Sequence, residues 1–154
     1  MSASISRFAR RATLFLLVPC LLAAPACTAP VPVFCLVDAD CDGMACARTN
    51  ECVPADELKS VRISWTLYGQ PASDELCSML AIDRMRATFE DNTNFDDLSY
   101  EPVPCAAGQI FYNRMPDRFD TFALKAVGVT GTVRDTRRVT LRDRDTTATL
   151  DLLP

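Results

Sequence analysis

Residues 60–68 read Ser-Val-Arg-Ile-Ser-Trp-Thr-Leu-Tyr and carry the clearest secondary-structure signal in the chain. Every second residue from Val61 to Leu67 is apolar, which is the pattern of a β-strand with one buried face. The turn-forming run Gly69-Gln70-Pro71 ends the strand. Trp65, the only tryptophan, belongs to the apolar set. We therefore expect it to anchor the core rather than to stack against a ligand.

Further strand patterns follow as far as the end of the chain. A Ser-Asp-Glu run at 73–75 predicts the start of one short helix. The expected strands are 84–90, 98–104, 109–114 and 121–129, with a final hairpin formed by 137–142 and 146–152. Strands of this length and spacing are typical of a sandwich. The predicted fold is mainly β: residues 60–154 form a single antiparallel β-sandwich of about seven strands with one short helix, preceded by a small disulfide-rich module.

The turn before residues 121–129 suggests a subtype of the sandwich. Pro116 and Phe119 precede a strand that carries Phe122 and Leu124. This layout resembles bacterial extracellular β-sandwiches of the transthyretin-like or carboxypeptidase-regulatory type, in which a turn rich in Pro and Gly precedes a Tyr-x-Leu strand. An immunoglobulin-like strand order is equally compatible with the residues, so the subtype stays open.

A cysteine-rich stretch, residues 35–52, lies upstream of the sandwich, and a polar linker at 53–59 joins the two. So short a stretch cannot bury enough apolar surface to fold unaided, so disulfides are needed. Its four cysteines, Cys35, Cys41, Cys46 and Cys52, allow three pairings. The pattern resembles short cysteine-rich modules of exported bacterial lipoproteins and, more distantly, Dickkopf-type repeats. That resemblance implies the pairs Cys35–Cys46 and Cys41–Cys52. We expect Cys77 and Cys105 to form a third bridge.

Asp38, Asp40 and Asp42, followed by Gly43, match the opening of an EF-hand calcium loop. The twelfth position, where a chelating Glu belongs, is Thr49. Solvated turn aspartates are the simpler interpretation, with calcium as the alternative ligand. Zinc bound by the four cysteines is disfavoured by their spacing and by an oxidising compartment. The polar loop 91–97 is likewise predicted to serve as a turn rather than as a cation site.

The first 26 residues have the parts of a secretory signal peptide: basic Arg7, Arg10 and Arg11, then an apolar segment that ends in small residues. This segment is too short for a permanent membrane span. Ala24-Pro25-Ala26 before Cys27 resembles the lipobox of bacterial lipoproteins, with Ala24 where Leu is usual. The resemblance implies lipidation of Cys27, and residues 27–34 then form a proline-rich tether.

The cysteine count agrees with lipidation. The chain has eight cysteines, of which Cys20 lies in the signal peptide. If Cys27 carries lipid, an even set of six remains, which fits a disulfide framework in an exported protein. The expected location is the cell envelope, with the outer membrane favoured over a secreted or periplasmic form. The alternative is a secreted protein in which Cys27 pairs with another thiol.

Several function classes are disfavoured. The chain has no histidine, which removes the commonest general base and zinc ligand. Net charge is −4 although the signal peptide is basic, so nucleic-acid binding is not expected. We predict no enzyme and no cofactor, but a binding, scaffold or adhesion lipoprotein that contacts the membrane through its lipid and an envelope protein or glycan. The alternative is a carbohydrate- or calcium-binding accessory module, which would use exposed Tyr68, Tyr100 and Tyr112 or the aspartate loop.

Overall fold

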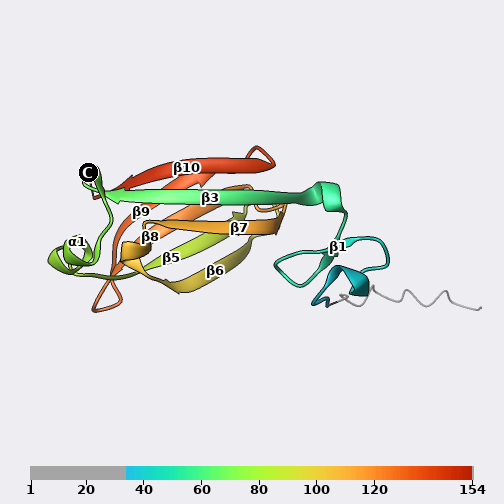
Figure 1. Cartoon of the computed structure of the whole chain (residues 1–154), viewed down its shortest axis with the longest axis horizontal. Helices are drawn as coiled ribbons and strands as arrows, with labels where there is room; N and C mark the ends of the chain where they lie inside the picture. The colour runs from blue at the N-terminus through green and yellow to red at the C-terminus, as the bar shows by residue number, and fades with distance from the viewer. Residues whose placement is uncertain (1–33, 154) are drawn as a thin grey trace, which may run out of the picture. The chain divides into compact units, whose positions relative to one another are not determined.

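The strand expected at 60–68 is β3, Leu58–Leu67, and it lies in the middle of one sheet (Figure 1). Every second side chain along it is buried, as the apolar period predicts. Trp65 is among the buried ones, and its Nε1 donates a hydrogen bond of 2.9 Å to the carbonyl oxygen of Cys105. Trp65 is therefore the core anchor that the sequence predicts.

A computed structural model describes residues 34–153, which belong to one compact unit. The predicted signal peptide, Cys27 and all of the tether except Phe34 lie outside the described residues. Phe34 itself forms an isolated antiparallel bridge with Glu51, so it is already part of the cysteine-rich module.

Two sheets form the sandwich, and seven of their strands are eight to ten residues long. The first sheet has the order β10-β3-β7, and the two-residue strand β4 (Gln70–Pro71) also pairs with β3. The second sheet has the order β6-β5-β8-β9. The six long strands other than β3 are β5 (Ile82–Asp91), β6 (Asp96–Val103), β7 (Gln109–Pro116), β8 (Thr121–Gly128), β9 (Val133–Thr140) and β10 (Asp145–Leu152). The mainly β sandwich with one short helix is thus the observed fold.

The predicted final hairpin is wrong. β9 pairs with β8 in the second sheet, whereas β10 pairs in parallel with β3 in the first sheet. The chain crosses between the sheets at Leu141, which is buried and donates its N–H to Asp120 O at 2.7 Å. Because the first and last long strands share a sheet, the order also differs from the constant-type immunoglobulin arrangement, in which they do not. The transthyretin-like class stays a prediction.

The core lies between the two sheets. Its largest fully buried side chains include Phe89, Phe119 and Phe122. Phe89 belongs to β5 and Phe122 to β8, and Phe119 lies in the turn between β7 and β8. The ring centroid of Phe89 lies 5.1 Å from that of Phe122 and 6.2 Å from that of Phe119, both in edge-to-face geometry. Such aromatic clusters stabilise a core beyond the area that they bury.

Helix α1, Asp74–Met79, is the one α-helix of the described residues and covers one end of the sandwich (Figure 1). Ser73 caps it by accepting a hydrogen bond from Leu76 N at 3.2 Å, as the Ser-Asp-Glu signal predicts. A disulfide joins Cys77 in the helix to Cys105 in the 3₁₀ turn η3, Cys105–Ala107. This is the third bridge expected from the sequence, and it fixes the helix to the segment that accepts the Trp65 hydrogen bond.

The cysteine-rich module contains little regular structure. It consists of the 3₁₀ turn η1 (Asp38–Asp40) and the two-residue strands β1 (Ala45–Cys46) and β2 (Cys52–Val53), which pair with each other. Disulfides join Cys35 to Cys46 and Cys41 to Cys52, the pairs that the resemblance implied. The expected linker 53–59 is shorter than predicted, because a second 3₁₀ turn, η2 (Ala55–Glu57), leads directly into β3 at Leu58.

Candidate binding site at the module–sandwich junction

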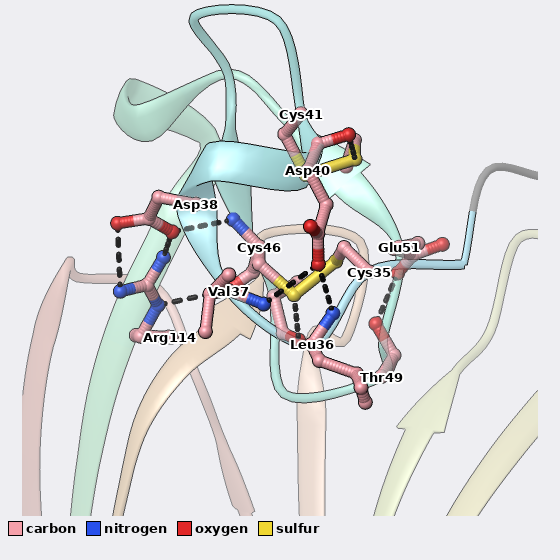
Figure 2. Close-up of a disulfide and its surroundings, with 12 residues drawn as sticks. Cys35, Leu36, Val37, Asp38, Asp40, Cys41, Cys46, Thr49, Glu51 and Arg114 are labelled. Carbon is pink, nitrogen blue, oxygen red and sulfur yellow. Dashed lines mark hydrogen bonds and ion pairs between the residues drawn. A yellow bond between two sulfur atoms is a disulfide. The ribbon is translucent and has the colours of Figure 1, made fainter.

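Two aspartates of the module hold its own backbone. Asp40 Oδ2 accepts hydrogen bonds from Leu36 N at 2.8 Å and Val37 N at 3.1 Å, and Asp38 Oδ1 accepts one from Cys46 N at 2.8 Å (Figure 2). The two backbone bonds hold the pKa of Asp40 below its ordinary value. The pKa of Asp38 is also lowered, first by its contact with Arg114 and then by the Cys46 bond. Both side chains act as structural acceptors.

Arg114 joins the module to β7. Its Nε donates to Cys46 O at 2.8 Å and its Nη1 to Asp38 Oδ2 at 3.2 Å, and Nη2 forms an ion pair with Asp38 Oδ1 (Figure 2). The backbone contributes as well, since Arg48 N donates to Arg114 O at 2.9 Å. Arg114 thus holds the module against the sandwich through both its side chain and its backbone carbonyl oxygen.

A β-bulge explains how Arg114 reaches the module. The register between β3 and β7 shifts between Lys59 and Val61, so two residues of β7 lie opposite Ser60. Arg114 is one of these two residues and has φ = 61°, a conformation that favours glycine. Bulges redirect side chains at sheet edges. Here the bulge turns an arginine out of the ladder and toward the disulfide-bonded module.

Arg118 forms a second connection. It makes an ion pair with Glu51 of the module, and its Nε lies 3.8 Å from Asp91 Oδ2 at the end of β5. Asp91 is buried and organises the loop that follows, because it accepts hydrogen bonds from the backbone N–H groups of Thr93 and Asn94 at 2.9 and 3.0 Å. The loop has the predicted turn chemistry but is shorter than the predicted 91–97: it spans residues 92–95, because Asp91 ends β5 and Asp96 begins β6.

Arg48 of the module lies over two tyrosines of the sandwich. Its guanidinium carbon is 5.2 Å from the ring centroid of Tyr112 and 5.6 Å from that of Tyr100, and the two ring centroids are 4.6 Å apart. Tyr112 is buried and Tyr100 is half-buried, so the prediction that these two tyrosines are exposed is wrong. Tyr68 is exposed, as predicted. Burial, then the neighbouring Tyr100, raises the pKa of Tyr112 to about 12.

These contacts surround a hollow, which we call the junction hollow. Its volume is about 440 Å³, and it is lined by residues of the module and of β7, among them Leu36, Val37, Arg48, Asn50, Asn113 and Arg114. The wall thus combines apolar side chains with amide and guanidinium groups. Small-molecule sites have volumes of this order, although most have a mainly apolar wall, whereas five of the nine lining residues here are polar or charged. Hydrogen bonding and apolar contact are the chemistry that it offers.

The predicted calcium loop does not bring its three carboxylates together. Asp38 is bound to Arg114 and Asp40 to its own backbone, while Asp42 occupies an exposed turn with φ = 44°. Within residues 34–153, the one group of three potential metal ligands within 4.8 Å of one another is Cys35, Cys41 and Cys52. All three are in disulfides, which leaves no thiolate there for a metal.

Sequence patterns indicated Asp38 and the tyrosines, but not the arginines that join the module to the sandwich. Arg48, Arg114 and Arg118 follow no motif, and their roles depend on a bulge and on contacts between segments far apart in the chain.

Lys59 is a further residue that sequence patterns did not indicate. Its side chain is buried, and Nζ donates a hydrogen bond of 3.2 Å to the carbonyl oxygen of Leu141 and lies 3.7 Å from Asp117 Oδ1. Desolvation lowers its pKa, although Asp117 and Asp120 oppose the shift.

The predicted lipidation site, Cys27, lies outside the described residues. In the described part of the chain, no helix is long and apolar enough to cross a membrane. Comparisons of the chain with protein-family models, with curated proteins and with solved structures found no match.

Proposed function

We propose that the protein is a non-enzymatic, exported lipoprotein of the cell envelope that is anchored through Cys27 and binds a partner at the junction hollow. The observation that carries the binding role is the hollow itself, which disulfides and two arginine contacts hold in a fixed shape. A preformed site loses less conformational entropy on binding than a flexible one. The outer membrane is the favoured location, with a secreted or periplasmic form as the alternative.

The composition of the hollow supports binding rather than catalysis. Catalysis by general acid–base or nucleophilic routes needs a group with a suitable pKa or an activated thiol or hydroxyl beside a base. The chain has no histidine, and every cysteine among residues 34–153 is in a disulfide. Asp38, the acidic group of the wall, is paired with Arg114, which lowers its pKa and makes it a poor proton donor or acceptor at neutral pH.

Metabolic labelling with an alkyne-bearing fatty acid tests the anchor. The wild-type protein should incorporate the label and fractionate with membranes, whereas Cys27→Ser should remain unlabelled and appear in the soluble fraction. Ser78→Ala is a control because it alters an exposed hydroxyl that is far from Cys27 in the sequence. Equal labelling of the wild type and Cys27→Ser would show that Cys27 does not carry the lipid.

A carbohydrate-binding accessory module without lipid is the alternative, and one observation favours it. Asn50, Asn113 and Arg48 line the hollow and supply the donors and acceptors that sugar hydroxyls pair with. A glycan array distinguishes the two functions. Saturable binding that Asn113→Ala abolishes would support the carbohydrate module, and a blank array together with fatty-acid labelling would exclude it in favour of the lipoprotein.

A further inference from the structure

Exposed apolar side chains lie at the beginning of the described chain. Phe34 is 78% exposed, Leu36 is 87% exposed and Val37 is 58% exposed. The residue between them, Cys35, is buried in its disulfide, so the backbone on which these side chains sit is fixed. Leu36 and Val37 also line the junction hollow. We call Phe34, Leu36 and Val37 the apolar rim.

The apolar rim is close in sequence to the proposed lipid anchor. Phe34 follows Cys27 by seven residues. A fully extended chain spans at most about 3.3–3.6 Å per residue, so Phe34, the first residue of the rim, lies within roughly 25 Å of the anchored backbone. This distance is less than the thickness of a bilayer with its headgroups, about 40–45 Å. An anchor at Cys27 therefore leaves Phe34 within reach of the membrane surface and raises the effective concentration of the rim there.

The chemistry of the rim and the hollow fits that surface. An aromatic and two aliphatic side chains suit the boundary between headgroups and acyl chains. Arg48, in the wall beside them, is exposed and makes no salt bridge with any residue between 34 and 153. Its guanidinium lies over the rings of Tyr112 and Tyr100, and the N–H groups at its edge suit a phosphate. Arg114, by contrast, has its donors engaged by Asp38 and Cys46. The apolar rim thus lies beside the polar groups of the wall, which is the arrangement that an interfacial contact requires.

We propose that the apolar rim and the junction hollow form a second membrane contact, in which Phe34, Leu36 and Val37 enter the interface and Arg48 meets a phospholipid phosphate. This inference rests on the proposed function, since it requires the anchor at Cys27, and it names the partner of the same hollow. The contact holds the module against the bilayer. Because Arg114 and Arg118 join the module to the sandwich, the contact also fixes how the sandwich is presented.

Tryptophan quenching tests the contact in the lipidated full-length protein. The protein is reconstituted into phosphatidylcholine vesicles, with and without brominated phosphatidylcholine as the quencher. Leu36→Trp adds a reporter at the rim, and the native Trp65 is buried and serves as an internal reference. Met79→Trp is the matched control, because Met79 is 72% exposed on α1. Helix α1 follows the C-terminal end of β3, whereas the module precedes its N-terminal end.

We expect the emission that Leu36→Trp adds to fall about twofold in brominated vesicles, since an interfacial side chain lies within about 5–10 Å of the acyl boundary. The Met79→Trp and wild-type emissions should not change. If Leu36→Trp is not quenched while the protein floats with the vesicles, or if Met79→Trp is quenched instead, the inference is wrong and the lipoprotein function stands. If the protein neither floats nor carries fatty acid, the proposed function itself fails.

Discussion

At the scale of single residues, Arg114 is one of the two arginines that join the module to the sandwich. It is held in a left-handed conformation at a bulge, and it donates hydrogen bonds to both a carboxylate and a carbonyl of the module. A non-glycine residue in this conformation costs free energy that its contacts must offset. The contacts that offset this cost are the side-chain hydrogen bonds of Arg114 to Asp38 and Cys46 and the bond that its carbonyl oxygen accepts from Arg48 N.

Arg114→Ala should therefore loosen the module without unfolding the sandwich. Hydrogen exchange at the Cys46 and Arg48 amides should become faster on the order of tenfold, because charge-assisted bonds contribute more than neutral ones. Exchange in β5 and β8 should stay unchanged. The control is Arg62→Ala, which removes an arginine that lies over Phe111 at 4.7 Å instead of over the module. Equal exchange in the two variants would contradict the role assigned to Arg114.

Because of Tyr112, the stability of the fold is expected to fall at alkaline pH. Its folded-state pKa is raised from 10.0 to about 12, so the folded protein keeps the phenolic proton after the unfolded chain has lost it. The stabilisation is complete below pH 10 and is lost as pH rises toward 12. Two pKa units correspond to about 3 kcal/mol. Urea denaturation should show this loss in the wild type, and Tyr112→Phe should remove it while leaving stability at pH 7 nearly unchanged.

At the scale of elements, local patterns predicted most strands and failed where pairing is non-local. The alternation of apolar residues placed β3 within two residues of its start, because one face of that strand is buried. The alternation in 137–142 and 146–152 is equally clear, yet β9 and β10 join different sheets. Nothing in the periodicity of two adjacent strands says whether they pair with each other. The parallel pairing of β10 with β3 joins residues more than eighty positions apart.

The bridge between α1 and η3 should stabilise the sandwich as a whole. Cys77 and Cys105 are 28 residues apart, and closing a loop of that length in the unfolded chain corresponds to roughly 3–4 kcal/mol. The double variant Cys77→Ala/Cys105→Ala should lose about this much in urea denaturation followed by Trp65 fluorescence. The native emission should persist, because Trp65 is bonded to the backbone oxygen of Cys105 and not to its sulfur. A loss below about 1 kcal/mol would mean that the bridge constrains little.

At the scale of the whole molecule, the sequence was enough to predict a cysteine-rich module followed by a sandwich, but not the junction hollow between them. Cysteine spacing and apolar periodicity are local properties, and they separated the module from the sandwich. The junction hollow arises where Asp38, Arg48 and Arg114 meet, and these residues are brought together by a bulge and by a backbone bond between distant segments. The aspartates that suggested calcium are instead acceptors for arginine and for backbone N–H groups.

The module and the sandwich should differ in what they need to stay folded. The buried core of the module consists of Cys35, Cys41 and Cys46, with Cys52 packed against them, whereas the sandwich has an aromatic core of its own. A variant with these four cysteines changed to alanine loses two bridges, each of which contributes about 2–3 kcal/mol to so short a segment. Residues 34–53 should then exchange freely in hydrogen-exchange mass spectrometry, while Trp65 fluorescence still reports a cooperative unfolding transition. Removing the bridges by substitution leaves Cys77–Cys105 intact, which a chemical reductant would not. If the sandwich instead loses its cooperative transition together with the module, then the contacts of Arg114 and Arg118 are required for its folding, and the two parts are energetically one domain.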